Sequence, residues 1–229
     1  MLKGAIFDHD GLMFDTEKVW QANWKLVADE MGITLPEAFK SEICGSSGQH
    51  MLDVIQKYYN VEDGTDIRDR VRQGVSDDEA KHIDMKEGLM DILEMFQKNG
   101  VKMAVASSSQ KDMIVRNLKN ANVEEYFEVV VSGQEVEHGK PAPDIFLLAA
   151  ERLGVDPKDC YVFEDAFNGV KAGVASGAKT IMIPDLLQPT EEIRNQVAAV
   201  CKTLKEASEK IEKNSSFAHE GCLSKIDNH

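Results

Sequence analysis

The sequence predicts an α/β fold with a doubly wound parallel sheet and an inserted bundle of α-helices. Two patterns support this prediction. Short apolar runs alternate with helical patterns over most of the 229 residues, as is typical of buried parallel strands connected by helices. Residues 16–82 break this alternation, because they contain helical patterns but no convincing strand. An interval of that length exceeds an ordinary loop, so it predicts a separate small unit.

Five apolar runs are expected to form the strands, because each is rich in Val, Ile, Phe or Ala and is flanked by Gly, Asp or Ser. In chain order they are residues 2–7, 101–106, 129–131, 161–163 and 180–183. Helical patterns at 88–99, 110–121, 143–153 and 168–176 separate the strands. Gly100, Gly154 and Gly177 each follow the end of a predicted helix, a position where the backbone is often left-handed and glycine is favoured. Short connections between such elements are typical of a doubly wound sheet.

Residues 16–82 are expected to form a helical cap domain, and residues 1–15 and 83–212 the α/β core. The first cap helix has an apolar face that ends at Gly32 and consists of Trp20, Trp24, Val27, Ala28 and Met31. Pro36 suits the first turn of a second helix, and a third presents Met51, Leu52, Ile55 and Tyr58. A fourth spans 66–81, and we interpret the charged face from Glu62 to Glu79 as solvated.

Two hinges, near residues 15–17 and 81–86, would connect the cap to the core. The alternative is a helical decoration packed rigidly on the sheet. Residues 213–229 lose the periodicity and predict a disordered tail.

Composition excludes several classes of partner. The chain has 26 Lys and Arg against 40 Asp and Glu, a formal net charge of −14, which opposes binding to nucleic acid and to anionic membranes. The four cysteines show no metal-binding spacing, and the sequence shows no signal peptide and no membrane-length apolar run. We therefore expect a cytoplasmic monomer that binds a small molecule, since a local cation can still attract an anionic substrate.

Polar residues follow several of the predicted strands, where ligands bind in open α/β sheets. They are Asp8 and Asp10 after the first strand, Ser107, Ser108 and Ser109 after the second, Lys140 before the helix at 143, and Glu164 and Asp165 after the strand at 161–163. Each signal alone has a plainer explanation. Asp8 and Asp10 alone could form a polar turn, Ser107 or Glu164 could cap a helix, and Lys140 could be solvated.

Together, these residues fit phosphoryl transfer. Carboxylates gathered at one edge need a cation to remain ionised, and an all-oxygen ligand set favours Mg²⁺. Free backbone N–H groups at the Gly11 turn and the Ser107 hydroxyl suit phosphoryl oxygens, and Lys140 supplies a compact positive charge. An aspartate can act as the nucleophile and form an aspartyl-phosphate. A second aspartate two residues later can protonate the leaving oxygen and then activate water.

The order Asp8-x-Asp10-Gly11-x-x-x-Asp15, Ser107, Gly139-Lys140-Pro141 and Glu164-Asp165-x-x-Asn168-Gly169 strongly resembles the haloacid dehalogenase (HAD) superfamily of phosphotransferases. More narrowly, the chain resembles the helical-cap subfamily that includes sugar phosphatases and β-phosphoglucomutase. The resemblance implies a HAD-like, Rossmann-like core, with Asp8 as nucleophile and Asp10 as general acid/base. It also implies that Asp8, the Asp10 backbone carbonyl and Asp165 bind Mg²⁺, with Glu164 at or next to the ion. Ser107, Ser108 and Lys140 would bind the phosphoryl group.

Departures from the family pattern narrow the expected activity. The presence of Asp10 argues against dehalogenation, because true dehalogenases of the superfamily lack this second aspartate. Mutase-like members carry a His in the first cap helix and a basic substrate loop, where this chain has Trp20 and the loop residues Gly45, Ser46 and Ser47. Trp20 could equally be part of the cap core, and the loop an ordinary turn. We interpret His9 as a packing or surface residue.

We therefore expect a Mg²⁺-dependent phosphatase that hydrolyses a small sugar- or nucleoside-type phosphomonoester through an aspartyl-phosphate intermediate. The nearest alternative is a β-phosphoglucomutase-like phosphomutase acting on a hexose phosphate. A receiver-type signalling domain fits less well, because its acceptor aspartate ends a later strand. A catalytically idle binding protein is also less suitable, because none of the expected catalytic positions is lost.

Overall fold

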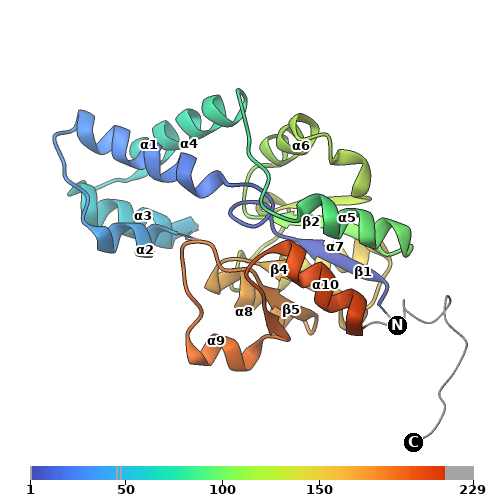
Figure 1. Cartoon of the computed structure of the whole chain (residues 1–229). Helices are drawn as coiled ribbons and strands as arrows, with labels where there is room; N and C mark the ends of the chain where they lie inside the picture. The colour runs from blue at the N-terminus through green and yellow to red at the C-terminus, as the bar shows by residue number, and fades with distance from the viewer. Residues whose placement is uncertain (1, 45, 47, 215–229) are drawn as a thin grey trace, which may run out of the picture.

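A parallel sheet forms the centre of the computed structural model, which describes residues 2–44, 46 and 48–214 (Figure 1). Within these residues the strands are β1 (Gly4–Phe7), β2 (Lys102–Ser107), β3 (Val129–Ser132), β4 (Cys160–Glu164), β5 (Lys179–Met182) and β6 (Ala199–Val200). Their order is β3-β2-β1-β4-β5-β6, and every neighbouring pair is parallel. The predicted doubly wound fold is confirmed. The two-residue β6 was not predicted.

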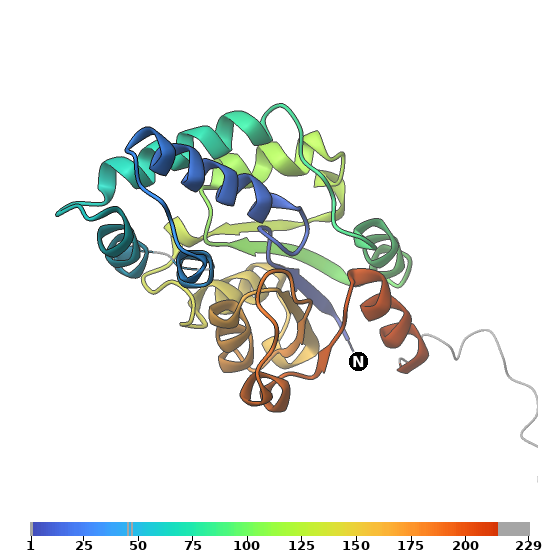
Figure 2. The ribbon, with the colours of Figure 1, turned by 60° about the vertical axis from the view of Figure 1, so that its left-hand side comes forward.

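Alternating side chains of the strands form two cores, one on each face of the sheet. In β1, Ala5 and Phe7 face one core and Ile6 faces the other, and all three are buried. Helices α5 (Leu89–Lys98), α6 (Lys111–Asn120) and α10 (Leu204–Asn214) contribute to the first core, and α7 (Asp144–Leu153) and α8 (Phe167–Ala175) to the second or its margin (Figure 2). The short α9 (Glu191–Gln196) lies beside α8. The predicted strands and helices of the core are confirmed to within two residues at each end.

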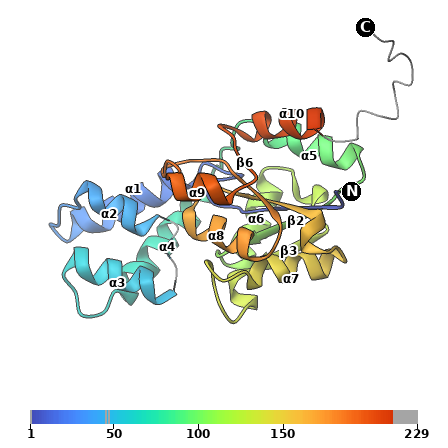
Figure 3. The same cartoon turned by 90° about the horizontal axis from the view of Figure 1, so that it is seen from below.

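Residues 16–79 form a helical cap with a hydrophobic core of its own. Its helices are α1 (Thr16–Glu30), α2 (Glu37–Ile43), α3 (Gly48–Tyr59) and α4 (Thr65–Glu79), and they gather on one side of the molecule (Figures 1 and 3). The aromatic side chains of Trp24, Phe39 and Tyr59 pack together at the centre, and the Tyr59 hydroxyl donates to the Trp24 carbonyl at 2.7 Å. An independent apolar core is what a separate unit requires.

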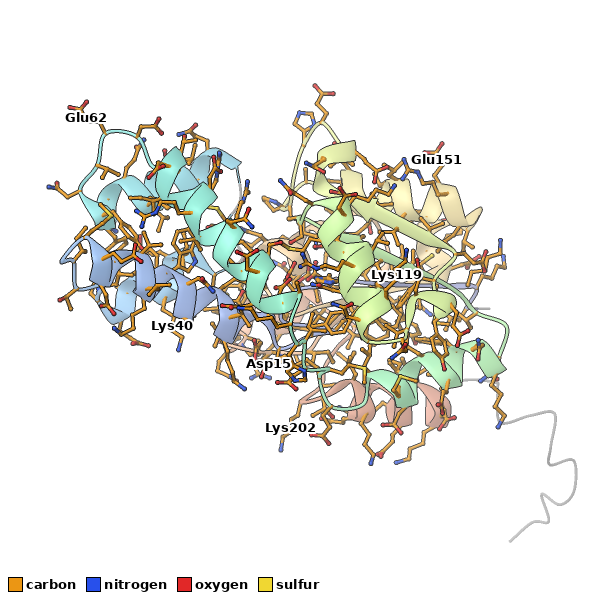
Figure 4. All side chains as sticks on the ribbon, turned by 90° about the horizontal axis from the view of Figure 1, so that it is seen from above. Asp15, Lys40, Glu62, Lys119, Glu151 and Lys202 are labelled. Atoms are coloured by element: carbon orange, nitrogen blue, oxygen red, sulfur yellow. The ribbon has the colours of Figure 1, made fainter. Side chains whose placement is uncertain are left out.

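Several expectations about the cap faces were wrong. Met31 lies beyond the end of α1 and is 39 % exposed, because the chain has already turned towards Gly32. Leu52 and Tyr58 are only half-buried, and Val54 and Tyr59 are the more deeply buried residues of α3. The charged face of α4 is not wholly solvated, since Glu79 is fully buried against the core domain. Elsewhere on the cap, charged side chains such as Lys40 and Glu62 project outwards (Figure 4).

The two connections between cap and core lie side by side. Phe14 and Met85 pair as an antiparallel bridge, and the Asp15 amide donates to the Asp84 carbonyl at 2.9 Å. Asp15 lies at this junction (Figure 4) and accepts from Lys86 Nζ at 3.1 Å. Paired connections of this kind support the proposed division into a cap of residues 16–82 and a core of residues 1–15 and 83–212.

The structure also bears on the predicted tail, on the state of the cysteines and on the expected absence of a membrane-spanning segment. Helix α10 continues to Asn214, and residues 215–229, the greater part of the predicted tail, lie outside the described residues. Cys44, Cys160 and Cys201 are free thiols. No helix in the described ranges is long and apolar enough to cross a membrane. The cytoplasmic location and the monomeric state stay predictions.

Candidate active site

The carboxyl ends of three adjacent strands bring the predicted residues to one edge of the sheet. Phe7 of β1 pairs with Val105 of β2 and Phe163 of β4, so the residues that follow these strands are neighbours. The Asp8 amide donates to the Phe163 carbonyl at 3.0 Å and continues the β1–β4 pairing by one residue. A cavity of about 580 Å³ opens here between the sheet edge and the cap.

Three buried carboxylates meet at this edge. Asp8, Glu164 and Asp165 are 6 %, 1 % and 4 % exposed, and each offers an oxygen within 4.8 Å of the others. Burial raises the pKa of Asp8 to about 7, although Lys140 opposes the shift. Burial, and next the charge of Glu164, raise the pKa of Asp165 well above its usual value. A cation would allow these groups to ionise together, and their all-oxygen chemistry fits Mg²⁺.

Lys140 connects two of these carboxylates. Its ammonium contacts Asp8 Oδ1, lies 2.7 Å from Glu164 Oε1 and donates to the Ala106 carbonyl at 3.2 Å. The side chain of Lys140 is only 7 % exposed. Although burial opposes it, the charges of Asp8 and Glu164 raise the pKa of Lys140, so this side chain is a fixed cation.

Glu164 has both carboxylate oxygens engaged. Besides the contact of Oε1 with Lys140, Oε2 accepts hydrogen bonds from the Asp165 and Ala166 amides at 2.9 and 3.1 Å. The carboxylate lies against Gly169, where an added Cβ would overlap it, so a glycine is required there. These contacts fit a Glu164 that orients Lys140 and lies beside the cation position.

Asp10 is held apart from the three carboxylates. Its Oδ2 accepts hydrogen bonds from the Ser109 and Ser107 hydroxyls at 2.6 and 3.2 Å, and its Oδ1 lies 3.2 Å from His9 Nδ1. Although burial opposes it, the neighbouring His9 and the two hydroxyls keep the pKa of Asp10 well below its usual range. The Asp10 side chain therefore has its own set of hydrogen-bond donors and does not belong to the cluster formed by Asp8, Glu164 and Asp165. Ser109 was not predicted to contact Asp10, although it belongs to the serine run that the sequence shows.

The turn at Gly11 differs from the prediction. The Gly11 amide is not free, because it donates to the Thr16 hydroxyl at 3.0 Å and approaches the Phe14 carbonyl at 3.1 Å. Gly11 has a φ of +77°, and a Cβ there would overlap the Asp165 carboxylate. Glycine is thus needed for the conformation and for the close approach of Asp165, and not to expose its own amide to phosphate.

The predicted phosphate-binding serines differ in exposure. Ser107 is buried, and its hydroxyl accepts from the Ser109 amide at 3.0 Å while it donates to Asp10. Ser108 is exposed and lines the cavity. The structure thus places Ser107, Ser108 and Lys140 around the same space as Asp8.

The cap supplies the opposite wall of the cavity. Trp20 is half-buried and lines the cavity, with its ring centroid 6.3 Å from that of Trp24. Ser46 also lines it, but the Ser46 hydroxyl donates to the Ile43 carbonyl at 2.7 Å. The other two predicted loop residues, Gly45 and Ser47, lie outside the described residues.

Several cavity residues were missed by the sequence analysis. Helix α4 lines the cavity with Asp69, Arg72, Gln73 and Ser76, whose spacing places them on one helical face. Burial lowers the pKa of Arg72, and Arg116 of α6 adds a further cation to the lining. From α1, Glu17 also faces the cavity, and its pKa is raised to about 7, first by burial and then by Asp10 and Asp185. The helical spacing on α4 is the signal that could have revealed this wall.

A family model, curated relatives and solved structures all indicate the same protein family for this chain. A family model described as "Haloacid dehalogenase-like hydrolase" matches residues 5–183. The "Probable pseudouridine-5'-phosphatase" of Drosophila melanogaster is 33 % identical over 189 residues, which cover 79 % of this chain and 81 % of the relative. The "Phosphorylated carbohydrates phosphatase" of Thermotoga maritima is 30 % identical over 181 residues, with 79 % and 84 % covered. The structure of β-phosphoglucomutase from Clostridium difficile superposes with a TM-score of 0.77 at 23 % identity over 93 % of this chain and 96 % of that one, which shows a shared fold.

Proposed function

Because the chain belongs to the haloacid dehalogenase-like hydrolase family, we propose that it is a Mg²⁺-dependent phosphatase that cleaves a small sugar- or nucleoside-type phosphate ester. Phosphatase activity follows from the family and from relatives that are named phosphatases. One arrangement carries the finer proposal. Asp8 contacts Lys140 and lies next to Asp165, while Asp10, two residues later in the sequence, is held by the hydroxyl groups of Ser107 and Ser109.

Asp8 and Asp10 divide the proposed chemistry between them. A carboxylate oxygen of Asp8 forms a bond to phosphorus, and the bond from phosphorus to the ester oxygen breaks. Asp10 gives its proton to that leaving oxygen. Asp10 then takes a proton from a water that attacks the aspartyl-phosphate, which releases inorganic phosphate and restores the Asp8 carboxylate.

The surroundings of Asp10 suit both of its proposed steps. In the described structure its low pKa favours the ionised form, which is the form needed to activate water. A phosphoryl group bound nearby adds a like charge, which raises the pKa of Asp10 towards the protonated form needed for the first step. Ser107 and Ser109 hold the carboxylate in place while its charge changes.

The carboxylate cluster fits the proposed metal. Asp8, Asp165 and the Asp10 backbone carbonyl would hold Mg²⁺, with Glu164 beside it. The bound ion would offset the negative charge of the carboxylates and of the phosphoryl group. Lys140 contributes the remaining positive charge and keeps one oxygen of Asp8 in a fixed position.

The cavity supports a small ester as the substrate. Its volume of about 580 Å³ lies within the range of small-molecule pockets. Trp20 and Trp24 give the cap wall an apolar, aromatic portion, and Arg72 gives it a cation. The names of the two curated relatives, one a nucleotide-type and one a carbohydrate phosphatase, support the same substrate range.

A phosphomutase remains a second candidate because of Arg72. This chain lacks the basic substrate loop of the mutase-like members, which would have been one site for a second phosphate. Arg72, however, places a cation on the cap side of the cavity. Incubation with β-glucose 1-phosphate separates the two activities. Free phosphate supports the hydrolase, and glucose 6-phosphate supports the mutase.

A phosphate-release screen tests the proposed function. The purified protein is incubated with a panel of sugar phosphates and nucleoside monophosphates, with Mg²⁺ or with EDTA, and an Asp8→Asn variant is the control. We expect Mg²⁺-dependent release that the variant lacks. Absence of release from every ester, or full release by Asp8→Asn, would overturn the proposal.

A further inference from the structure

Two fully buried ionisable residues take no part in the proposed catalytic steps. They are Glu79, the last residue of α4, and His9, which stands between Asp8 and Asp10 in the sequence. Buried ionisable groups are costly to a fold unless they have partners, so their contacts indicate what they do.

Glu79 docks the cap on the core domain. Its Oε2 accepts from Asn117 Nδ2 at 2.7 Å and lies 3.4 Å from Arg116 Nη2. Arg116 also donates from Nη1 to the Ser76 hydroxyl at 2.8 Å, one turn earlier on α4. Helix α4 therefore lies beside α6 (Figure 2), joined through Arg116 and Asn117.

The His9 side chain lies beside Asp10. Its Nδ1 lies 3.2 Å from Asp10 Oδ1, a contact of ion-pair length without the angle of a regular hydrogen bond. Among the described residues, His9 Nε2 and Glu79 Oε1 both have no hydrogen-bond partner. Both Asp10 and Glu79 raise the pKa of His9, although burial opposes this, so His9 lies within electrostatic range of each.

The structure agrees with the interpretation of His9 as a packing residue and adds a polar contact to it. The side chain is fully buried, with its ring centroid 5.0 Å from that of Phe14, and its Nδ1 also lies next to Asp10. An apolar residue would fill the same space and leave Asp10 Oδ1 without this neighbour. The contact therefore has a consequence for Asp10 that packing alone does not supply.

We propose that His9 is a positioning residue for Asp10 and that Glu79, whose buried Oε1, like His9 Nε2, has no hydrogen-bond partner among the described residues, supports His9 from the cap. The proposal rests on the proposed function, in which Asp10 first donates and then accepts a proton. It predicts an effect on turnover and not on substrate affinity, because neither His9 nor Glu79 lines the cavity.

Two substrates separate positioning from folding within one protein sample. Para-nitrophenyl phosphate has a leaving group that needs no proton, so its first step does not require Asp10 as an acid, while an alkyl phosphate requires Asp10 in both steps. The variants are His9→Leu, which removes both ring nitrogens, His9→Asn, which keeps a donor near the Nδ1 position, and Glu79→Gln. Glu62→Gln, an exposed residue of the cap, is the matched control.

We expect His9→Leu to lower kcat for an alkyl phosphate by about ten- to a hundredfold, the cost of a misplaced catalytic group, with KM little changed. With para-nitrophenyl phosphate, His9→Leu should show a burst of nitrophenol followed by slow turnover, because only the second step then needs Asp10. His9→Asn should recover most of the rate, Glu79→Gln should lie between His9→Leu and wild type, and Glu62→Gln should match wild type.

Equal kcat values for wild type, His9→Leu and Glu79→Gln on both substrates would overturn the positioning role. The same holds if the two substrates lose activity equally without a burst, which is the result of partial unfolding. An active wild type with a fully active His9→Leu overturns this proposal alone. A wild type that releases no phosphate from any ester overturns the proposed function, and this proposal with it.

Discussion

Replacement of Lys140 by Met should destabilise the protein in a strongly pH-dependent manner. The Lys140 side chain is 7 % exposed, and the side chains of Asp8 and Glu164 that it contacts are 9 % and 2 % exposed, so solvent screens the interaction little. Removal of one partner from a buried ion pair costs about 3–5 kcal/mol, because the remaining charge is left uncompensated. We expect a loss of this size in the free energy of unfolding near pH 8, without metal.

The loss should shrink as the pH falls, because Asp8 can escape the penalty by binding a proton. The pKa of Asp8 is already raised from 3.8 to about 7 with Lys140 present. A carboxyl group with a raised folded-state pKa contributes stability below its unfolded pKa and loses it as the pH rises through the folded pKa. Lys140→Met raises that folded pKa further, and each pH unit is worth about 1.4 kcal/mol per group. We therefore expect less than about half of the loss near pH 5.5.

Urea unfolding followed by circular dichroism in EDTA, near pH 5.5 and near pH 8, measures this difference. Lys171→Met, which removes an exposed lysine of α8, is the control for the loss of a charge. If Lys140→Met is no less stable than Lys171→Met at the higher pH, or if its loss is the same at both pH values, the description of Lys140 as the cation of a buried carboxylate cluster is wrong.

The other predictions concern turnover, metal, acid/base geometry and a buried carboxyl group. Asp8→Asn and Asp10→Asn should each abolish phosphate release, and near-normal rates in either would remove its assigned role. EDTA should lower turnover by about a hundredfold or more, since a metal supplies several kcal/mol of charge stabilisation, and activity that survives the chelator contradicts the metal site. Ser109→Ala should lower kcat more than it raises KM, because Ser109 holds Asp10; steady-state kinetics would refute this if only KM changed. Glu17→Gln should stabilise the protein by up to about 3 kcal/mol above pH 7, because the pKa of Glu17 rises from 4.5 to about 7 and the wild type loses stability as the pH passes through that range. Urea titrations should show this gain vanish near pH 4.5, and a gain independent of pH would contradict it.

The sequence was sufficient to predict the sheet edge, because the argument there depends on local patterns and one general rule. Apolar runs located the strands, and parallel strands place the residues after their carboxyl ends together. Asp8 and Asp165 are far apart in the chain yet meet within 4.8 Å for that reason. The two-residue β6 was missed because a pair of residues, Ala199 and Val200, gives no period to detect.

Features that depend on how the cap sits against the core could not be predicted. Glu79 belongs to a charged helical stretch and looks solvated in sequence, but its burial is set by Asn117 and Arg116, about forty residues later. The contact of His9 with Asp10 depends on the turn that follows the end of the β1–β4 pairing, and the sequence does not reveal the geometry of that turn. The Gly11 amide donates a hydrogen bond to the Thr16 hydroxyl, and this contact depends on a turn geometry that the sequence does not reveal.

Transfer of a phosphoryl group to Asp8 is the central claim, and trapping that group tests it most directly. In Asp10→Asn, para-nitrophenyl phosphate can still phosphorylate the enzyme, but hydrolysis lacks its base, so the intermediate should accumulate. After mixing with Mg²⁺ and rapid acid quench, peptide mass spectrometry should find one phosphoryl group on Asp8, and none when Asp8 is also changed to Asn. A burst of nitrophenol with the phosphoryl group on another residue, or with no phosphorylated peptide, would contradict the account.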